Sequence, residues 1–132
     1  MDLGTGYGNL TYSTLVHPGD TWEDMKASLQ QYVPEVKKRI SPDKPFGVSL
    51  RLANSSVETL MAQPQERAWL KKFLTDNDLY IFTINAFPYG PFKNVVVKEN
   101  VYEPDWTTDQ RTKYTMNIAD ILAEVTREVD EP

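Results

Sequence analysis

The alternation of apolar and polar residues predicts three short β-strands. Residues 46–52 place four apolar side chains on one face and small or polar side chains on the other. Residues 79–85 are apolar on both faces, which is typical of a strand buried on both sides. Residues 10–16 are rich in β-branched side chains and favour a further strand near the start of the chain.

The segment between the first two predicted strands has the pattern of an amphipathic helix. Its apolar residues recur at spacings of three and four from Trp22 to Ile40, which forms a single stripe. Thr21 can cap this helix together with Asp24, three residues later. Pro34 lies inside the stripe and is expected to kink the helix or to split it in two.

Two further helical regions follow the second and third predicted strands. The first comprises a short helix near 57–61 and a longer one in which Pro64 suits the first turn. The second is expected to begin near Thr107 or Thr108, and its apolar stripe extends to Val125. Strand and helix patterns therefore alternate along the chain, as in folds with a parallel sheet covered by helices.

The spacing of the strand ends indicates a repeating unit. His17, Arg51 and Asn85 each follow or end a predicted strand, and successive members are 34 residues apart. That is an ordinary length for a βα unit of a (β/α)8 barrel, which usually needs ~250 residues. We therefore expect residues 1–132 to form a single α/β domain with three consecutive βα units of an incomplete TIM barrel and parallel strands.

The second face of the predicted strand 46–52 differs from a surface that helices cover. It carries Gly47, Ser49 and Arg51, which suit the inner face of a barrel near its mouth. An open three-stranded sheet would leave this face and two strand edges partly without cover. We therefore expect either that the chain is a truncated barrel or that self-association covers the open sheet.

The strand-end residues are the candidate ligand site, because ligands of parallel α/β folds bind beyond the carboxyl ends of the strands. His17 offers a titratable ring, Arg51 a fixed cation for a phosphate or carboxylate, and Asn85 an amide that can orient a hydroxyl. This mixture indicates a small polyhydroxylated or anionic metabolite. The alternatives are structural: a hydrogen bond of His17 within its turn, an ion pair of Arg51 with a neighbouring carboxylate, and bonds of Asn85 to the loop backbone.

The connection over residues 86–106 is far longer than the usual βα loop. It begins AFPYGPF and contains five aromatic residues among prolines and a glycine. Phe87 and Tyr89 are predicted to contact the metabolite, and the remaining candidates are predicted to form a lid: Pro88, Gly90, Phe92, Tyr102 and Trp106. The alternative is that these side chains pack as a plug over the sheet end. An extra strand or hairpin within 94–102 is a further alternative.

Composition argues against several classes of function. The chain has 14 Lys plus Arg against 19 Asp plus Glu, and this net charge of −5 disfavours binding to nucleic acid. It contains no cysteine and a single histidine, which excludes disulfides, thiolate metal sites and histidine-rich zinc sites within this chain. The start lacks signal-peptide features, and no segment approaches the ~20 apolar residues of a membrane span. These features predict a cytoplasmic protein.

Four ordered blocks of the sequence carry a family resemblance. The EboE family of metabolite traffic proteins begins with blocks similar to TYSTLVHPGDTWEDM (11–25), SPDKPFGVSLRLAN (41–54), YIFTINAFPYGPF (80–92) and VKENVYEPDWTTDQR (97–111). This family belongs to the xylose isomerase-like, or sugar phosphate isomerase/epimerase-like, TIM-barrel group. Residues that match its pattern are His17, Pro18, Gly19, Arg51, Asn85, Pro88, Tyr89 and Gly90. Residues that depart from it are Ser13, Leu15, Val16 and Ala86.

The resemblance implies a function as well as a fold. It implies the N-terminal part of a metal-dependent sugar phosphate isomerase or epimerase that takes part in metabolite processing or traffic. In this group a divalent metal is usually held by Glu, Asp and His residues of later strands, so no cofactor is expected in this chain, which alone should be inactive. The alternative is a non-catalytic module that binds a metabolite or a partner.

Overall fold

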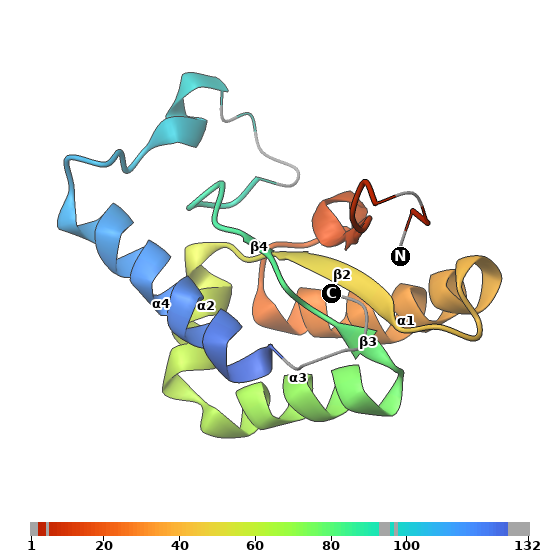
Figure 1. Cartoon of the computed structure of the whole chain (residues 1–132). Coiled ribbons are helices and arrows are strands. Elements are labelled where there is room, and N and C mark those ends of the chain that lie inside the picture. The colour runs from red at the N-terminus through yellow and green to blue at the C-terminus, as the bar shows by residue number, and fades with distance from the viewer. Residues whose placement is uncertain (1–2, 5, 93–95, 97, 127–132) are drawn as a thin grey trace.

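The structure describes residues 3–4, 6–92, 96 and 98–126. Among these residues, four α-helices pack against one face of a small parallel sheet (Figure 1). In this computed structural model the strands are β1 (Tyr12–Ser13), β2 (Phe46–Arg51), β3 (Leu79–Tyr80) and β4 (Ile84–Asn85). The helices are α1 (Trp22–Ile40), α2 (Asn54–Ala62), α3 (Pro64–Asp76) and α4 (Asp109–Val125). Two 3-10 helices of the described residues are η1 (Thr14–Val16) and η2 (Lys98–Tyr102).

The central strand of the sheet is β2. Tyr12 of β1 pairs with Val48, and the sheet order is β1-β2-β3, with all pairs parallel. The strands β3 and β4 follow one another along β2. The expected mixed α/β architecture with a parallel sheet is therefore present.

The predicted strand 79–85 is interrupted, which corrects the expectation of one continuous strand. Leu79 and Tyr80 pair with Phe46 and Gly47, whereas Ile84 pairs with Leu50. Three residues, 81–83, therefore lie opposite only two residues of β2, which is the arrangement of a β-bulge. Because the extra residue disturbs the pairing, the segment is not buried throughout, and the side chain of residue 82 is 44 % exposed.

The predicted strand 10–16 is also much shorter than expected. After Ser13 the chain turns into η1, where the Ser13 hydroxyl accepts a hydrogen bond from the amide of Leu15 at 3.3 Å. The hydroxyl of Thr14 accepts a hydrogen bond from the amide of Arg51 at 3.0 Å. A side chain thus satisfies the amide at the end of β2, where a longer β1 would have offered a backbone carbonyl.

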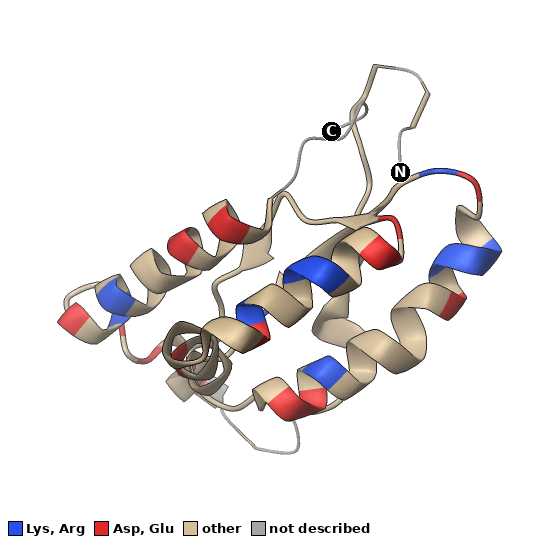
Figure 2. Ribbon diagram, turned by 90° about the horizontal axis from the view of Figure 1, so that it is seen from below, with Lys and Arg blue, Asp and Glu red and all other residues tan. Residues whose placement is uncertain are grey.

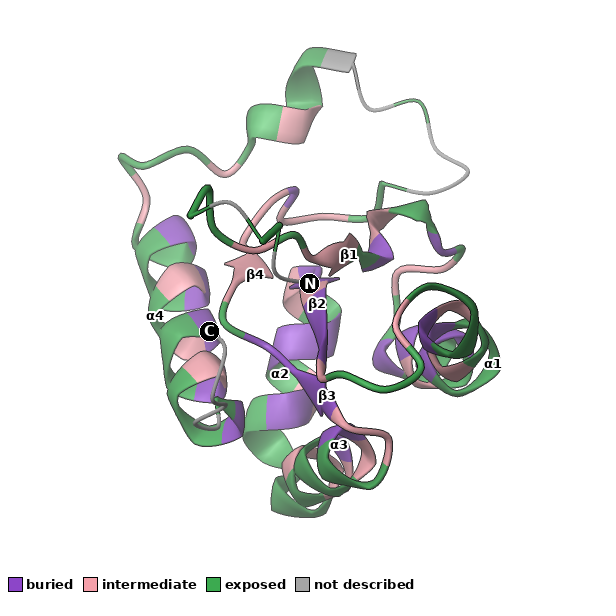
Figure 3. Cartoon of the chain, turned by 45° about the vertical axis from the view of Figure 1, so that its right-hand side comes forward, coloured by how far each residue is buried: buried purple, intermediate pink, exposed green. Residues whose placement is uncertain are grey.

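The hydrophobic core lies between the helices and the apolar face of β2. Phe46, Val48 and Leu50 are fully buried there. The helices contribute their own stripes to the same cluster: Leu29 and Val33 of α1, Val57 and Leu60 of α2, Leu70 and Leu74 of α3, and Ile118 and Ile121 of α4. Buried residues accordingly line the inner side of each helix (Figure 3). The alternation in 46–52 predicts this face correctly.

The other face of β2 carries the small and polar residues. Gly47 and Arg51 are buried and Ser49 is half-buried. A Cβ atom at Gly47 would lie 3.1 Å from the ring of Tyr80, so the neighbouring strand's side chain covers this position. Figure 1 shows the N-terminal segment and the long connection on this side of the sheet, opposite the helices.

The helix α1 begins as predicted and continues through its proline. Thr21 and Asp24 form the expected capping box. Pro34 lies inside a single continuous helix, so the expected split does not occur, because packing of the helix against the core outweighs local propensity. Tyr32 and Ile40, expected in the apolar stripe, are instead 38 % and 58 % exposed.

The starts of the other helices agree with the sequence signals in two cases of three. Pro64 is the first residue of α3, and Thr108 caps α4 through a hydrogen bond from the amide of Arg111. The helix α2 begins at Asn54, earlier than the expected helix near 57–61, and no side chain caps it. Acidic and basic residues are interspersed along the helices (Figure 2).

Candidate functional site

Arg51, the last residue of β2, is the centre of a polar network at the strand ends. Its side chain is 2 % exposed. One terminal nitrogen, Nη1, donates to the carboxylate of Asp20, and the other, Nη2, donates to the carbonyl of Gly90 at 3.1 Å. The ring of Phe92 lies 5.8 Å from the guanidinium carbon. The ion pair that the sequence left open as an alternative for Arg51 is therefore present.

Asp20 connects the turn before α1 to the long connection. Its Oδ2 accepts a hydrogen bond from the amide of Phe92 at 3.1 Å, and its carbonyl accepts one from the hydroxyl of Ser56 at 3.0 Å. The turn depends on Gly19, whose φ is 87° and where a Cβ atom would lie 2.2 Å from the Cβ of Asp24. The segment HPGD therefore builds both the start of α1 and one wall of the network.

A donor of the Arg51 guanidinium has no partner within the described residues. Its Nε is buried and makes no hydrogen bond there. Leaving a buried donor unsatisfied costs roughly 1–3 kcal/mol, so such a group needs an explanation. Asn85 is the register partner of Arg51 on the neighbouring strand, and its side chain is half-buried. Register partners on parallel strands share a face of the sheet, so the two side chains lie on the same face at the strand ends.

His17 lies apart from this pair, on the helix side of the sheet. Its Nε2 is 2.8 Å from the hydroxyl of Tyr12, whose own strand partner belongs to the apolar face of β2. The ring of His17 also lies 5.1 Å, between centroids, from that of Tyr32 on α1. Burial raises the pKa of Tyr12 above its ordinary value. The structure thus brings Arg51 and Asn85 together, whereas His17 belongs to a cluster with the two tyrosines.

A second buried cation, Arg111 of α4, joins the two ends of the long connection. Arg111 is only 4 % exposed. Its Nε donates to the carbonyl of Pro104 at 2.9 Å, and its Nη1 donates to the carbonyl of Ala86 at 3.3 Å. Aromatic rings lie 5.7–5.9 Å from its guanidinium carbon, those of Phe87, Trp106 and Tyr114. Carbonyl dipoles and ring faces therefore stabilise this charge.

Tyr114 lies between the two cations and ties α4 to the end of β2. Its hydroxyl donates to the carbonyl of Leu52 at 2.5 Å. Burial raises its pKa from 10.0 to about 12, although the charges of Arg51 and Arg111 act in the opposite direction. The ring of Tyr89 meets that of Tyr114 edge to face at 5.1 Å. Tyr114 thus also supports the first part of the long connection.

The first part of the predicted lid, residues 86–92, lies against the strand ends. Pro88 is buried, and the carbonyl of Gly90 and the amide of Phe92 belong to the Arg51 network. The ring of Phe87 contacts Arg111 instead of the network around Arg51. This part therefore covers the strand ends as the plug alternative describes.

The later part of the predicted lid stands away from the sheet in two views (Figures 1 and 3). Tyr102 and Trp106 are 66 % and 69 % exposed. The ring of Tyr102 lies 5.8 Å from that of Phe87, and the ring of Trp106 lies over Arg111. Within the alternative strand or hairpin, 98–102 is a 3-10 helix, and residues 94, 95 and 97 lie outside the described residues. In this structure the later part does not cover the strand ends.

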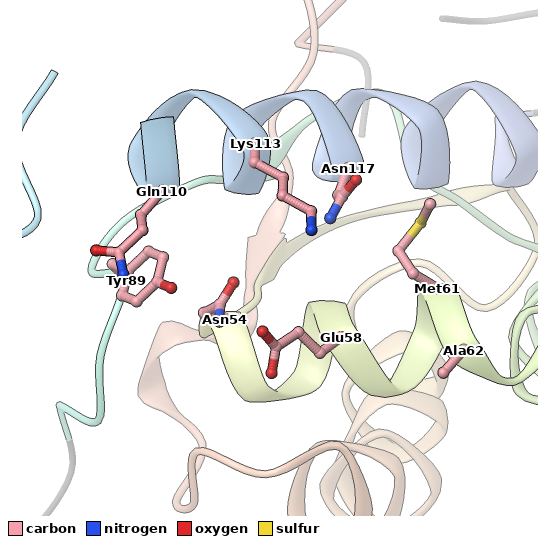
Figure 4. A pocket seen from close by; sticks show the side chains of 8 residues that line it. All are labelled: Asn54, Glu58, Met61, Ala62, Tyr89, Gln110, Lys113 and Asn117. Carbon is pink, nitrogen blue, oxygen red and sulfur yellow. The ribbon is translucent and has the colours of Figure 1, made fainter. Parts of the chain in front are cut away.

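Tyr89 lines a groove between α2 and α4. The groove has a volume of about 540 Å³, and its other lining residues are Asn54, Glu58, Met61, Ala62, Gln110, Lys113 and Asn117 (Figure 4). The backbone N–H of Asn54 donates to the backbone carbonyl of Tyr89 at 2.8 Å, which fixes the connection against the start of α2. From its place in the long connection, Tyr89 is predicted to contact a ligand. The pattern of apolar residues does not predict the groove.

The sequence reasoning missed Asp20 and Arg111, although each has a signal. Asp20 directly precedes the cap of α1, at the end of a turn that follows a strand. Arg111 lies three residues before Tyr114, so it occupies a position of the apolar stripe of α4. A charged residue at a stripe position indicates a buried and therefore partnered charge.

No family model, curated protein or solved structure matches the chain in the three comparisons. In the part of the chain that the structure describes, no group of three or more His, Cys, Asp or Glu side chains could hold a metal ion. No helix of these residues is long and apolar enough to cross a membrane.

Proposed function

We propose that these βα units are the N-terminal part of a sugar phosphate isomerase/epimerase-like TIM-barrel protein, similar to the EboE family, and that their strand ends bind a metabolite. The sheet order β1-β2-β3 follows the chain, and the helices share one core on one face. A doubly wound sheet reverses its strand order and carries helices on both faces. A barrel keeps one direction and places its helices outside, which supports the barrel proposal.

The observation that carries the ligand proposal is the buried Nε of Arg51 beside Asn85. Both terminal nitrogens of Arg51 are already engaged, by Asp20 and by Gly90. The carboxylate of Asp20 already compensates the charge of Arg51, so the Nε–H offers a directed hydrogen bond, whereas a phosphate is held best by a cation without such a partner. A hydroxyl or a single carboxylate oxygen suits this donor better, so we favour a polyhydroxylated ligand over a phosphate.

The roles follow from this geometry. The Nε of Arg51 donates to a ligand oxygen, and the amide of Asn85 orients a neighbouring hydroxyl. Residues 86–92 shield these contacts from water, since they are fastened over the strand ends. In such a barrel the divalent metal and the reacting groups would come from later strands, so the part described here binds and positions the metabolite.

The proposal is tested by titration with D-xylose and, separately, with D-glucose 6-phosphate, followed by ¹H–¹⁵N NMR. We expect D-xylose to shift the Arg51 Nε–H resonance, and we expect Asn85→Ala to weaken binding about tenfold, which is the loss of one good hydrogen bond. Asn100→Ala, at an exposed position of η2, is the matched control and should bind normally. An unmoved resonance at saturating sugar, or equal affinity of Asn85→Ala, would contradict the proposal. Tighter binding of the phosphate would contradict the preference for hydroxyls.

A non-catalytic module that associates with a second copy is the alternative proposal. The observation that favours it is Phe82, which is 44 % exposed and stacks on Tyr80 at 5.9 Å between ring centroids. Tyr80 itself is buried, so Phe82 is the exposed aromatic side chain that a second copy would cover. Sedimentation equilibrium tests this self-association. A molecular mass that stays at the value of the monomer up to millimolar concentration would rule the alternative out.

A further inference from the structure

The groove between α2 and α4 gathers polar side chains that the strand-end proposal does not use. It lies in the helix layer, where α2 and α4 are in contact, and the strand-end pair lies at the end of the sheet. Figure 4 shows Lys113 and Asn117 extending from α4 towards α2, with the side chains of Asn54 and Glu58 facing them. The volume of about 540 Å³ is ample for a small-molecule ligand.

The helical spacing of these residues explains why they converge. Asn54, Glu58 and Ala62 are four residues apart along α2, so they share one face of it. On α4 the lining residues recur at intervals of three and four: Gln110, Lys113 and Asn117. Both faces are polar in their first turns, and both are turned towards the groove (Figure 4).

Opposite charges face each other across the groove without forming an ion pair. Glu58 lies on the α2 wall and Lys113 on the α4 wall. Among the described residues neither side chain forms an ion pair, so both charges are available to a ligand in the groove. A ligand that carries both an ammonium and a carboxylate would complement both walls at once.

The groove also has an apolar end. Met61 and Ala62 lie at the end opposite Tyr89, and Met61 reaches towards α4 (Figure 4). At the polar end the hydroxyl of Tyr89 points into the groove. A ligand with a charged head and a short apolar tail therefore matches the order of the lining residues.

We propose that the α2–α4 groove binds a free α-amino acid with an aliphatic side chain. Its carboxylate binds Lys113, and its ammonium group binds Glu58. The amides of Asn54 and Asn117 supply further hydrogen bonds, and the aliphatic side chain packs against Met61. This site is independent of the strand-end site, because it shares neither Arg51 nor Asn85.

Calorimetric titration of the whole chain with L-leucine tests the proposal. Two analogues separate the charges: L-leucinamide lacks the carboxylate, and 4-methylpentanoate lacks the ammonium group. We expect L-leucine to bind at least about tenfold more tightly than either analogue, since each lacks one charge-assisted contact. Equal affinity of L-leucine and either analogue would overturn the proposal. So would the absence of L-leucine binding at about 10 mM, a concentration that would nearly fill a site with a Kd of about 1 mM.

Variants at the two walls identify the site. Glu58→Gln and Lys113→Met should each weaken L-leucine binding about 10- to 100-fold. Glu35→Gln on α1 and Lys71→Met on α3 are matched controls, because both positions are exposed helix surfaces away from the groove. All four variants should keep the helical circular dichroism of the parent chain. Binding that is unchanged in both wall variants would overturn the proposal, while D-xylose binding reports separately on the strand ends.

Discussion

The surroundings of Arg51 and Arg111 show two ways in which one fold buries a guanidinium group. Arg51 is 2 % exposed and faces the carboxylate of Asp20. Arg111 is 4 % exposed and is held by the carbonyls of Ala86 and Pro104 and by aromatic rings. Both arginines therefore have compensated charges, but the compensation is ionic in one region and dipolar in the other.

The two regions differ in which groups would lose a partner if the arginine were removed. Without Arg51, the carboxylate of Asp20 would lose its cation in a site that is only 15 % exposed. Without Arg111, the carbonyls of Ala86 and Pro104 would lose a donor, but no charge would lose its partner. Because a buried charge is costlier to leave alone than a carbonyl, the Arg51 region should be the more sensitive one.

Both regions nevertheless serve the same segment. Arg51 holds the carbonyl of Gly90, whereas Arg111 holds the carbonyl of Ala86 at the beginning of the connection and that of Pro104 near its end. The first part of the connection is thus fastened twice, once to β2 and once to α4. This explains why it lies against the strand ends while η2 stands away from them.

The largest effect is expected for Arg51→Met. It removes the cation beside Asp20 and should lower the free energy of unfolding by about 3–5 kcal/mol, measured by urea denaturation. The double variant Asp20→Asn/Arg51→Met should recover part of this loss, because it no longer buries a carboxylate. A loss below about 1 kcal/mol, with no recovery in the double variant, would show that the pair behaves like an exposed one.

Arg111→Leu should have a smaller effect, about 2–3 kcal/mol, because hydrogen bonds from a charged donor are lost but no charge is left alone. The same variant should make the connection 86–106 more sensitive to limited proteolysis. Arg111→Lys keeps the charge but not the planar fork, so it should fall between the parent and Arg111→Leu. A loss as large as that of Arg51→Met would remove the proposed contrast between the two regions.

The smallest effect is expected for Tyr114→Phe, at the boundary of the two regions. Loss of the hydrogen bond to the carbonyl of Leu52 should cost about 1 kcal/mol at neutral pH. The raised pKa of about 12 means that the folded chain holds the phenol proton more tightly than the unfolded chain does. The parent should therefore lose stability as the pH rises from 10 to 12, and Tyr114→Phe should lose less.

The matched control for this pH dependence is Tyr7→Phe, at a side chain that is 85 % exposed. It should follow the parent throughout the alkaline range. An identical alkaline profile of Tyr114→Phe and the parent would show that Tyr114 does not titrate differently in the folded chain.

The sequence determined the elements whose signals are local. Three such features were predicted from the sequence: the capping box of Thr21 and Asp24, the position of Pro64 at the start of α3, and the apolar stripe of α4. So was the apolar face of β2, because its alternation depends only on the two-residue period of a strand. Of the candidate site, the sequence placed Arg51 and Asn85 at neighbouring strand ends, and the register makes them partners.

Only the tertiary structure decided which groups meet. The pairing of Arg51 with Asp20 spans 31 residues, and the contact of Arg111 with Ala86 spans 25. The bulge in 81–83 depends on the register with β2, and the separation of His17 from Arg51 depends on which face of the sheet Tyr12 occupies. Periodicity reports which side of an element is buried. It carries no information about the partner, because distant segments become neighbours only when the helices and strands pack.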